Sequence, residues 1–121
     1  MRLFLFFSVW LLLSCASKAS SPYVDANEPE QLSTEQLKKL EARAVNHDAK
    51  AAFHLYTYYL FAEDGMAKAM YWLRVAANDG YPQAEYNLGA FLKQSSSSRD
   101  QKEAEVWLAK AAKDGVTTPT K

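Results

Sequence analysis

The sequence predicts an all-α fold: a short antiparallel α-helical solenoid of about two and a half helix-turn-helix repeats, preceded by a signal peptide and a flexible linker. Two observations predict this fold. Two segments of the chain match each other at a spacing of 33 to 35 residues, a period typical of helical repeat proteins. Each segment also ends in the same Ala-Ala and Asp-Gly pattern, after apolar residues at helical spacing. The 121 residues allow one small domain, and the net charge of +0 gives no electrostatic reason to expect nucleic acid as a partner.

An apolar run opens the chain. Arg2 is followed by apolar residues from Leu3 to Leu13, interrupted only by Ser8. This run is too short to cross a membrane as a helix, which needs roughly 20 residues. Its length and basic start are typical of a secretory signal, so we predict a signal peptide over residues 1–14, which the resemblance described next implies to be that of a lipoprotein.

Cys15 follows this run and is the only cysteine, so it cannot form a disulfide within the chain. It is an incidental cysteine, an intermolecular thiol or a lipid acceptor. The sequence LLSC at 12–15 resembles the bacterial lipobox, and this resemblance implies that Cys15 becomes the first mature residue and carries acyl chains such as palmitate. Two or three such chains anchor a protein stably in a membrane. By resemblance to the sorting of enterobacterial lipoproteins, Ala16 at the position where Asp would imply the inner membrane implies the outer membrane, facing the periplasm.

Residues 15–32 are expected to form the lipidated cysteine and a flexible tether. From Ala16 to about Gln31 the composition changes to Ser, Ala, Pro, Asn and acidic residues, and apolar periodicity is lost. A disordered tail is expected over 116–121.

A capping helix is predicted near 34–46, within a half repeat over 33–47. Ser33 and Gln36 have the spacing of a capping box, and Leu32 and Leu37 can pack across it as a hydrophobic staple. The apolar stripe of this helix is expected to be Leu37, Leu40, Ala44 and Val45.

The repeats themselves occupy 48–80 and 81–115, with helices predicted near 48–61, 67–78, 82–93 and 100–113. The offset is 33 residues in the first helix of each repeat and 35 in the second, so two extra residues fall in the loop QSSSSRD, where a repeat tolerates them. The aromatic run YTYYLF at 56–61, which favours a strand by composition, is therefore predicted to be helical. The equivalent positions are Ala51, Leu55 and Tyr59 with Ala84, Leu88 and Leu92, then Ala69, Trp72, Leu73 and Ala76 with Ala104, Trp107, Leu108 and Ala111.

Gly80 and Gly115 are predicted to end their helices in a left-handed conformation, which glycine adopts without steric cost. Pro82 fits the first turn of the following helix. The 34–46 helix aligns as the second half of a preceding repeat, and His47 then stands in the place of the glycine.

The pattern AxxxLGxxx…AxxWLxxAAxxG resembles the Sel-one-like repeat family, a relative of the tetratricopeptide repeats. The second repeat matches closely, whereas Tyr56 in the first stands where the family has glycine. The resemblance implies a repeat core made of Ala51, Leu55, Tyr59, Ala69, Trp72, Leu73, Ala76, Gly80, Ala84, Leu88, Gly89, Leu92, Ala104, Trp107, Leu108, Ala111 and Gly115.

A helical wheel adds Tyr58 and Phe91 to the core face. On the same wheel, a second set of residues points away from the core. The resemblance implies that these residues line a concave groove that binds peptides or protein surfaces. The partner-binding candidates are Phe53, His54, Thr57, Phe61, Tyr86, Asn87 and Gln94. The alternative is that Phe53 and Tyr86 only seal adjacent helices. Tyr56, on a stripe with Ala52 and Leu60, either faces Ala69, packs on the 34–46 helix or forms a further partner site.

The sequence predicts no catalytic residues, no cofactor and no metal site. His47 and His54 lie seven residues apart, and no cysteine or carboxylate completes a ligand set around them. Some Sel-one-like proteins are cysteine-rich and linked to β-lactam hydrolysis, but the mature part of this chain has no second cysteine, so that activity is not expected here. We predict that the protein is not an enzyme.

The expected function is that of a membrane-anchored periplasmic protein–protein interaction module. One version is an immunity lipoprotein that neutralises a secreted toxin, a type VI secretion effector such as a phospholipase; another is an envelope-assembly or stress-signalling adaptor. A purely structural lipoprotein is a further alternative. Because the core is small, a partner or a second copy of the chain in a homo-oligomer is expected to add stability.

Overall fold

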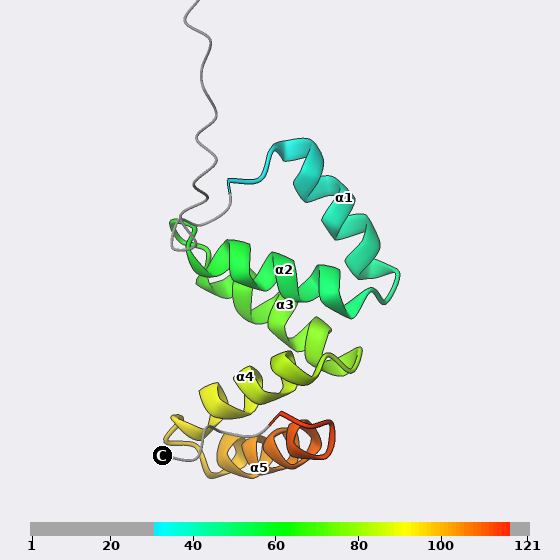
Figure 1. Ribbon diagram of the computed structural model, residues 1–121. Coiled ribbons are helices and arrows are strands. Elements are labelled where there is room, and N and C mark those ends of the chain that lie inside the picture. The colour runs from blue at the N-terminus through cyan, green and yellow to red at the C-terminus, as the bar shows by residue number, and fades with distance from the viewer. Residues whose placement is uncertain (1–30, 117–121) are drawn as a thin grey trace, which may run out of the picture.

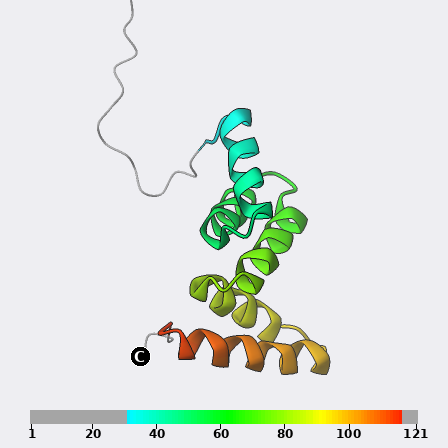
Figure 2. The same cartoon turned by 90° about the vertical axis from the view of Figure 1, so that its right-hand side faces the viewer.

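The computed structural model describes residues 31–116, which form five helices and no strand. The predicted signal peptide, the lipidation site Cys15, most of the tether and most of the tail lie outside the described residues. Figure 1 shows the helices stacked in chain order, and Figure 2 shows the same stack from the side. The fold class is confirmed as a short helical solenoid, with helices α1 (Thr34–Val45), α2 (Ala49–Leu60), α3 (Met66–Asn78), α4 (Pro82–Lys93) and α5 (Ser98–Lys113).

Neighbouring helices along the chain are also neighbours in space. The closest pairs are α2 with α3 and α4 with α5, which are the two predicted repeats. Helix α1 packs on α2 as α3 packs on α4, so the first helix behaves as the second half of a repeat whose first half is not among the described residues. The aromatic run 56–61 is helical through Leu60, because packing in the stack outweighs its β propensity.

Side chains cap the helix starts. Ser33 Oγ accepts a hydrogen bond from the Gln36 backbone N–H (3.2 Å), and Gln36 Oε1 accepts one from the Ser33 N–H (2.8 Å), which confirms the predicted capping box. Asp48 caps α2 by accepting from the Ala51 N–H at 3.0 Å. Pro82 lies in the first turn of α4.

The helix ends use left-handed residues at the predicted positions. The φ angles are 64° at His47, 84° at Gly80 and 89° at Gly115. Asp64, in the turn between α2 and α3, has a φ of 53° that the sequence analysis did not anticipate. At His47, Asp64 and Gly80 the chain reverses direction between two helices, whereas Gly115 follows α5, the last helix of the described residues.

Small and apolar side chains form one continuous core along the stack. Tyr59, Trp107 and Leu108, all expected in the core, are half-buried, while Gly80 and Gly115 are exposed in their turns. The other residues of the expected core are buried: Ala51, Leu55, Ala69, Trp72, Leu73, Ala76, Ala84, Leu88, Gly89, Leu92, Ala104 and Ala111.

Two residues expected on the apolar core side are exposed instead. Phe91 is 49% exposed, because no described helix covers its side of α4. Val45 ends α1 and projects into an open hollow beside α3. The wheel placed both residues correctly on an apolar face but assumed a neighbouring helix that the described stack does not supply.

Candidate functional site

The aromatic residues of α2 first define how α2 meets α4. The Phe53 ring lies 4.7 Å from the Tyr81 ring and 5.4 Å from the Tyr56 ring, measured between centroids. All three side chains are half-buried against the core. Phe53 therefore seals two helices, as the alternative in the sequence analysis held. Tyr81 was not among the residues predicted from the sequence. It could have been noticed because an aromatic residue stands at the position that Asp48 occupies one repeat earlier.

Tyr56 faces α4. Burial raises the pKa of its hydroxyl, and a hydrogen bond with Asn87 partly offsets that increase. These contacts place the Tyr56 ring beside Phe53 of its own helix and toward Asn87 of α4. A large ring fits here because it fills the space between two repeats.

His54 and Thr57 lie elsewhere. His54 lines a hollow of about 260 Å³ between α1 and α2, which we call the α1 hollow; its lining residues are Leu32, Gln36, Lys39, Leu40, Arg43 and His54. The Thr57 hydroxyl donates to the His54 backbone carbonyl at 2.8 Å, within its own helix. The structure thus separates His54 from the aromatic residues that the sequence grouped with it.

The C-terminal ends of α2 and α4 carry exposed apolar residues. Phe61, the C-cap of α2, is 68% exposed, and Leu60 and Phe91 are also exposed. Gln94, the C-cap of α4, donates to the Ala90 carbonyl at 3.4 Å. We group them with half-buried candidates of both helices and call this set the α2/α4 face: Phe53, Tyr56, Leu60, Phe61, Tyr86, Asn87, Phe91 and Gln94.

The α2/α4 face carries no formal charge. From Ala51 to Ala62 the chain has no Asp, Glu, Lys or Arg. In α4, Glu85 is buried against α5, and Lys93 lies in the last turn. Such a surface can make apolar and amide contacts but gives no charge-based steering of a partner.

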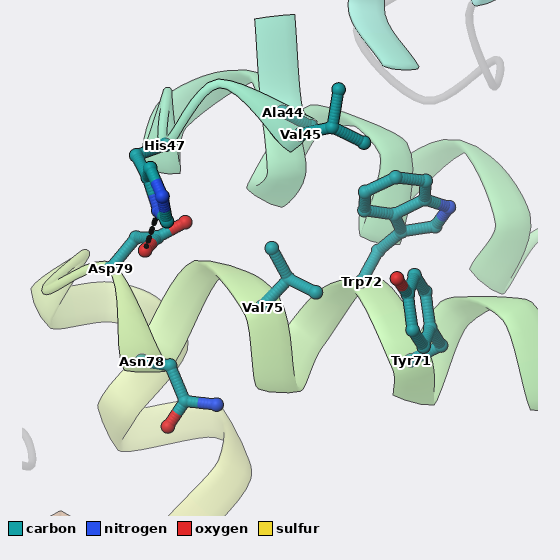
Figure 3. Close-up of a pocket in the computed structure, with 8 residues that line it drawn as sticks. All are labelled: Ala44, Val45, His47, Tyr71, Trp72, Val75, Asn78 and Asp79. Carbon is teal, nitrogen blue, oxygen red and sulfur yellow. Dashed lines mark hydrogen bonds and ion pairs between the residues drawn. The ribbon is translucent and has the colours of Figure 1, made fainter. Parts of the chain in front are cut away.

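A second hollow of about 310 Å³ lies between the end of α1 and the outer side of α3 (Figure 3). Val45, Trp72 and Val75 make one part of it apolar. At its other end His47 Nδ1 lies 2.9 Å from Asp79 Oδ1, which ties the turn after α1 to the end of α3. His47 and His54 therefore line different hollows.

A buried ion pair joins α4 to α5, and the sequence analysis missed it. Glu85 is fully buried, and its Oε1 lies 2.7 Å from Lys110 Nζ, which also lies 5.2 Å from the centre of the Trp107 ring. The ion pair could have been predicted by comparing the two repeats, because two apolar residues of the first repeat are both replaced by charged residues in the second. Glu85 stands in the place of Ala52, and Lys110 in the place of Val75. The pair links α4 to α5 and leaves the Glu85 carboxylate buried.

A second polar link joins α3 to α5. Glu103 accepts from Arg74 Nη1 at 2.8 Å and from Trp107 Nε1 at 3.2 Å. These two hydrogen bonds hold the pKa of Glu103 below its usual value. Asp48 has a lowered pKa for a similar reason, since it accepts from the Ala51 N–H and pairs with Arg43.

Acid is expected to weaken the fold through Glu103 and Asp48. A carboxylate with a lowered folded-state pKa contributes stability above its unfolded pKa, about 4, and this contribution is lost as the pH falls through the folded value. The melting temperature should therefore drop below about pH 4.5. The Glu103→Gln variant should melt lower at pH 7 and show a shallower decrease in acid. Parallel melting curves for variant and wild type between pH 7 and pH 3 would contradict the role of Glu103.

Residues 31–116 contain neither a cluster of metal ligands nor a membrane-spanning helix. No three side chains among His, Cys, Asp and Glu come together there in a way that could hold a metal ion. None of the five helices is both long enough and apolar enough to span a membrane.

Comparison with known proteins gives one similar sequence. The chain is 31% identical over 88 residues to YibG of Escherichia coli strain K12, a protein described as uncharacterized. The match covers 69% of this chain and 58% of YibG, so the chain spans less than two thirds of that relative's length. No family model matches the chain, and no solved structure matches it.

Proposed function

We propose that this protein is a membrane-anchored periplasmic interaction module that binds a protein partner through the α2/α4 face. The membrane part of the proposal rests on the sequence around Cys15, which resembles a lipobox. The binding part rests on the described residues. A short helical solenoid is a rigid scaffold whose side chains are well placed to contact another polypeptide.

One observation carries the binding proposal: aromatic rings near the C-terminal ends of α2 and α4 are exposed to solvent. Phe61 is 68% exposed at the end of α2, and Phe91 is 49% exposed on α4, which also carries half-buried Tyr86 and Asn87 and ends at the exposed Gln94. Interface cores are enriched in aromatic residues and depleted in charged ones, and they include a few amides that fix orientation. Leaving such rings in water is unfavourable, so covering them contributes to affinity.

The partner on this face should be recognised by shape and apolar contact. Because the face has no formal charge, binding should change little between low and high salt. A partner segment with its own apolar side chains and few charges fits this chemistry best.

The test is capture from an envelope extract with purified wild type and single variants, compared by quantitative mass spectrometry. Phe61→Ala and Phe91→Ala remove exposed rings of the face, whereas Phe53→Ala is unsuitable because Phe53 packs between helices. The matched control is Val106→Ala, since Val106 is 66% exposed on α5, away from this face. A true partner is captured by wild type and by the control. The captured amount of that partner should fall about tenfold or more with each of the two Phe variants, as expected for contacts worth about 2 kcal/mol.

Equal capture by all four folded proteins would exclude the α2/α4 face as the binding surface. The anchor is checked in the same cells: the Cys15→Ser variant should leave the membrane fraction, and a variant that stays there would contradict lipid anchoring at this residue.

A further inference from the structure

We infer that the α1 hollow is a docking site for one additional helix, and that a protein partner supplies this helix with acidic residues facing α1. This site is distinct from the α2/α4 face, and the inference does not depend on the function proposed for that face.

The internal repeat shows what normally covers this position. In the second repeat α4 packs on α5, with Gly89 so close that a Cβ there would lie 2.8 Å from Leu108 Cγ and 3.1 Å from the Ala104 carbonyl oxygen. In the first repeat Ala69 and Leu73 hold the equivalent positions on α3, where α2 packs. In both repeats this side of the second helix is covered by the first helix.

Helix α1 presents the same positions without a covering helix. Residues 36, 39, 40 and 43 of α1 are equivalent to 69, 72, 73 and 76 of α3. On α3 all four are buried, whereas on α1 only Leu40 is buried and the other three are exposed. The same four residues of α1 line the α1 hollow, and no other helix among residues 31–116 packs there.

Helix α2 completes the site. His54 of α2, the remaining lining residue besides Leu32, is equivalent to Asn87 of α4. Asn87 faces Tyr56 of the preceding α2, so His54 occupies the position that would face the preceding helix of the stack. The hollow therefore has both walls of a helix-binding groove, with Leu32 and Leu40 as its apolar residues.

The charges of the hollow indicate the chemistry of the docking helix. Its described lining includes Lys39 and Arg43 and no carboxylate. Lys39 pairs with Glu35 at 2.9 Å and Arg43 with Asp48 at 2.7 Å, and both cations are largely exposed. The Lys39–Glu35 pair is exposed on both sides and contributes little, so an incoming acid can replace Glu35 at Lys39 and share Arg43 with Asp48.

The protein already contains one such contact. Glu85 of α4 is directed at α5 and lies 2.7 Å from Lys110 Nζ. A helix that packs in the first position of a repeat therefore accommodates an acid facing the second helix. On α1 the position of Lys110 is held by Ala42, which lies between Lys39 and Arg43 in the sequence, so an acid at the corresponding position of a docking helix approaches these two cations.

The sequence of α4 provides the probe. A peptide of residues 81–94, acetylated, amidated and held helical by a lactam bridge, is titrated into the purified full chain. Binding is followed by fluorescence anisotropy and located by amide chemical shifts. The expected shifts fall on Gln36, Leu40 and His54, and a Glu85→Lys peptide should bind about tenfold more weakly because it places a cation beside Lys39 and Arg43.

Charge reversal on the protein distinguishes electrostatic attraction from non-specific binding of the peptide. On the Lys39→Glu/Arg43→Glu variant the preference between the two peptides should reverse, and on the milder Lys39→Gln/Arg43→Gln variant it should disappear. The matched control, Lys93→Glu/Lys102→Glu, should behave as wild type. Phe61→Ala and Phe91→Ala should also bind the peptide normally, which keeps this test separate from that of the α2/α4 face.

Three results would overturn the inference: no binding at millimolar peptide, equal affinity for both peptides, or shifts confined to α2 and α4. Binding that begins only when residues 1–30 are removed would assign the hollow to the chain's own N-terminal segment and would also overturn it.

Discussion

Replacing Lys110 with valine is expected to lower the free energy of unfolding by about 2–3 kcal/mol. The substitution leaves Glu85 fully buried without its cation, and Glu85 Oε2 already has no hydrogen-bond partner among the described residues. Breaking one side of a buried pair usually costs about 3–5 kcal/mol. We expect less here because Lys110 is 44% exposed, so water can reach the vacated position.

The matched double variant should recover this loss. Glu85→Ala/Lys110→Val gives the second repeat the residues that the first repeat has at the equivalent positions, Ala52 and Val75. Ala52 is fully buried in that arrangement, so the stack is known to accept it. Apolar replacement of a buried ion pair is often neutral or stabilising, and we expect stability within about 1 kcal/mol of wild type or above it.

Urea denaturation of the wild type, the two single variants and the double variant completes the cycle. The expected result is a favourable coupling between the two positions of about 2 kcal/mol or more. A double variant as unstable as the two single losses added together would show that Glu85 and Lys110 act independently.

The helices could be predicted from the sequence because the repeat supplied information that local propensity lacked. The run YTYYLF favours a strand by itself, but its alignment with residues 89–94 predicts a helix, and the structure has one through Leu60. The glycine at position 80 and the histidine at 47 marked helix ends for the same reason. A helix or a helix end predicted in one repeat is supported when the equivalent residues of the other repeat predict the same structure. A single copy gives no such support.

Side-chain partners were harder to predict, because they depend on which helices are absent as well as on which are present. Phe91 and Tyr58 share a wheel position, yet Phe91 is exposed where no described helix covers it. Tyr56 turned toward Asn87 because the space between α2 and α4 accommodates a ring. A helical wheel shows the direction of a side chain but not what lies in that direction.

The candidate partner-binding residues were separated for a related reason. The wheel grouped Phe53 and His54 as residues outside the core, although they differ by 100° around the helix. In the structure that angle places Phe53 against Tyr81 of the next repeat and His54 against α1 of the preceding one. Both contacts connect repeats, and only a three-dimensional stack distinguishes them.

Leucine-to-alanine substitution at one repeat position should destabilise the centre of the stack more than its ends. Leu40, Leu73 and Leu108 are equivalent residues of α1, α3 and α5. Leu73 is 1% exposed between α2 and α4, so Leu73→Ala should cost about 3–4 kcal/mol through lost burial and a cavity. Leu40 is 9% exposed on the terminal helix, and its loss should cost about 1–2 kcal/mol because the site can collapse and admit water.

The way in which the three variants unfold should differ as well. In a linear stack each repeat is stabilised mainly by its neighbours, so a central cavity weakens both interfaces of α3, whereas an end cavity weakens only one. Leu40→Ala should therefore increase amide hydrogen exchange in α1 alone, and Leu108→Ala, half-buried in α5, should do so in α5 and part of α4. Leu73→Ala should increase exchange in all five helices and lower the urea midpoint most. If all three substitutions lowered stability equally and globally, residues 31–116 would behave as one indivisible core, and α1 could not be treated as an open end of the stack.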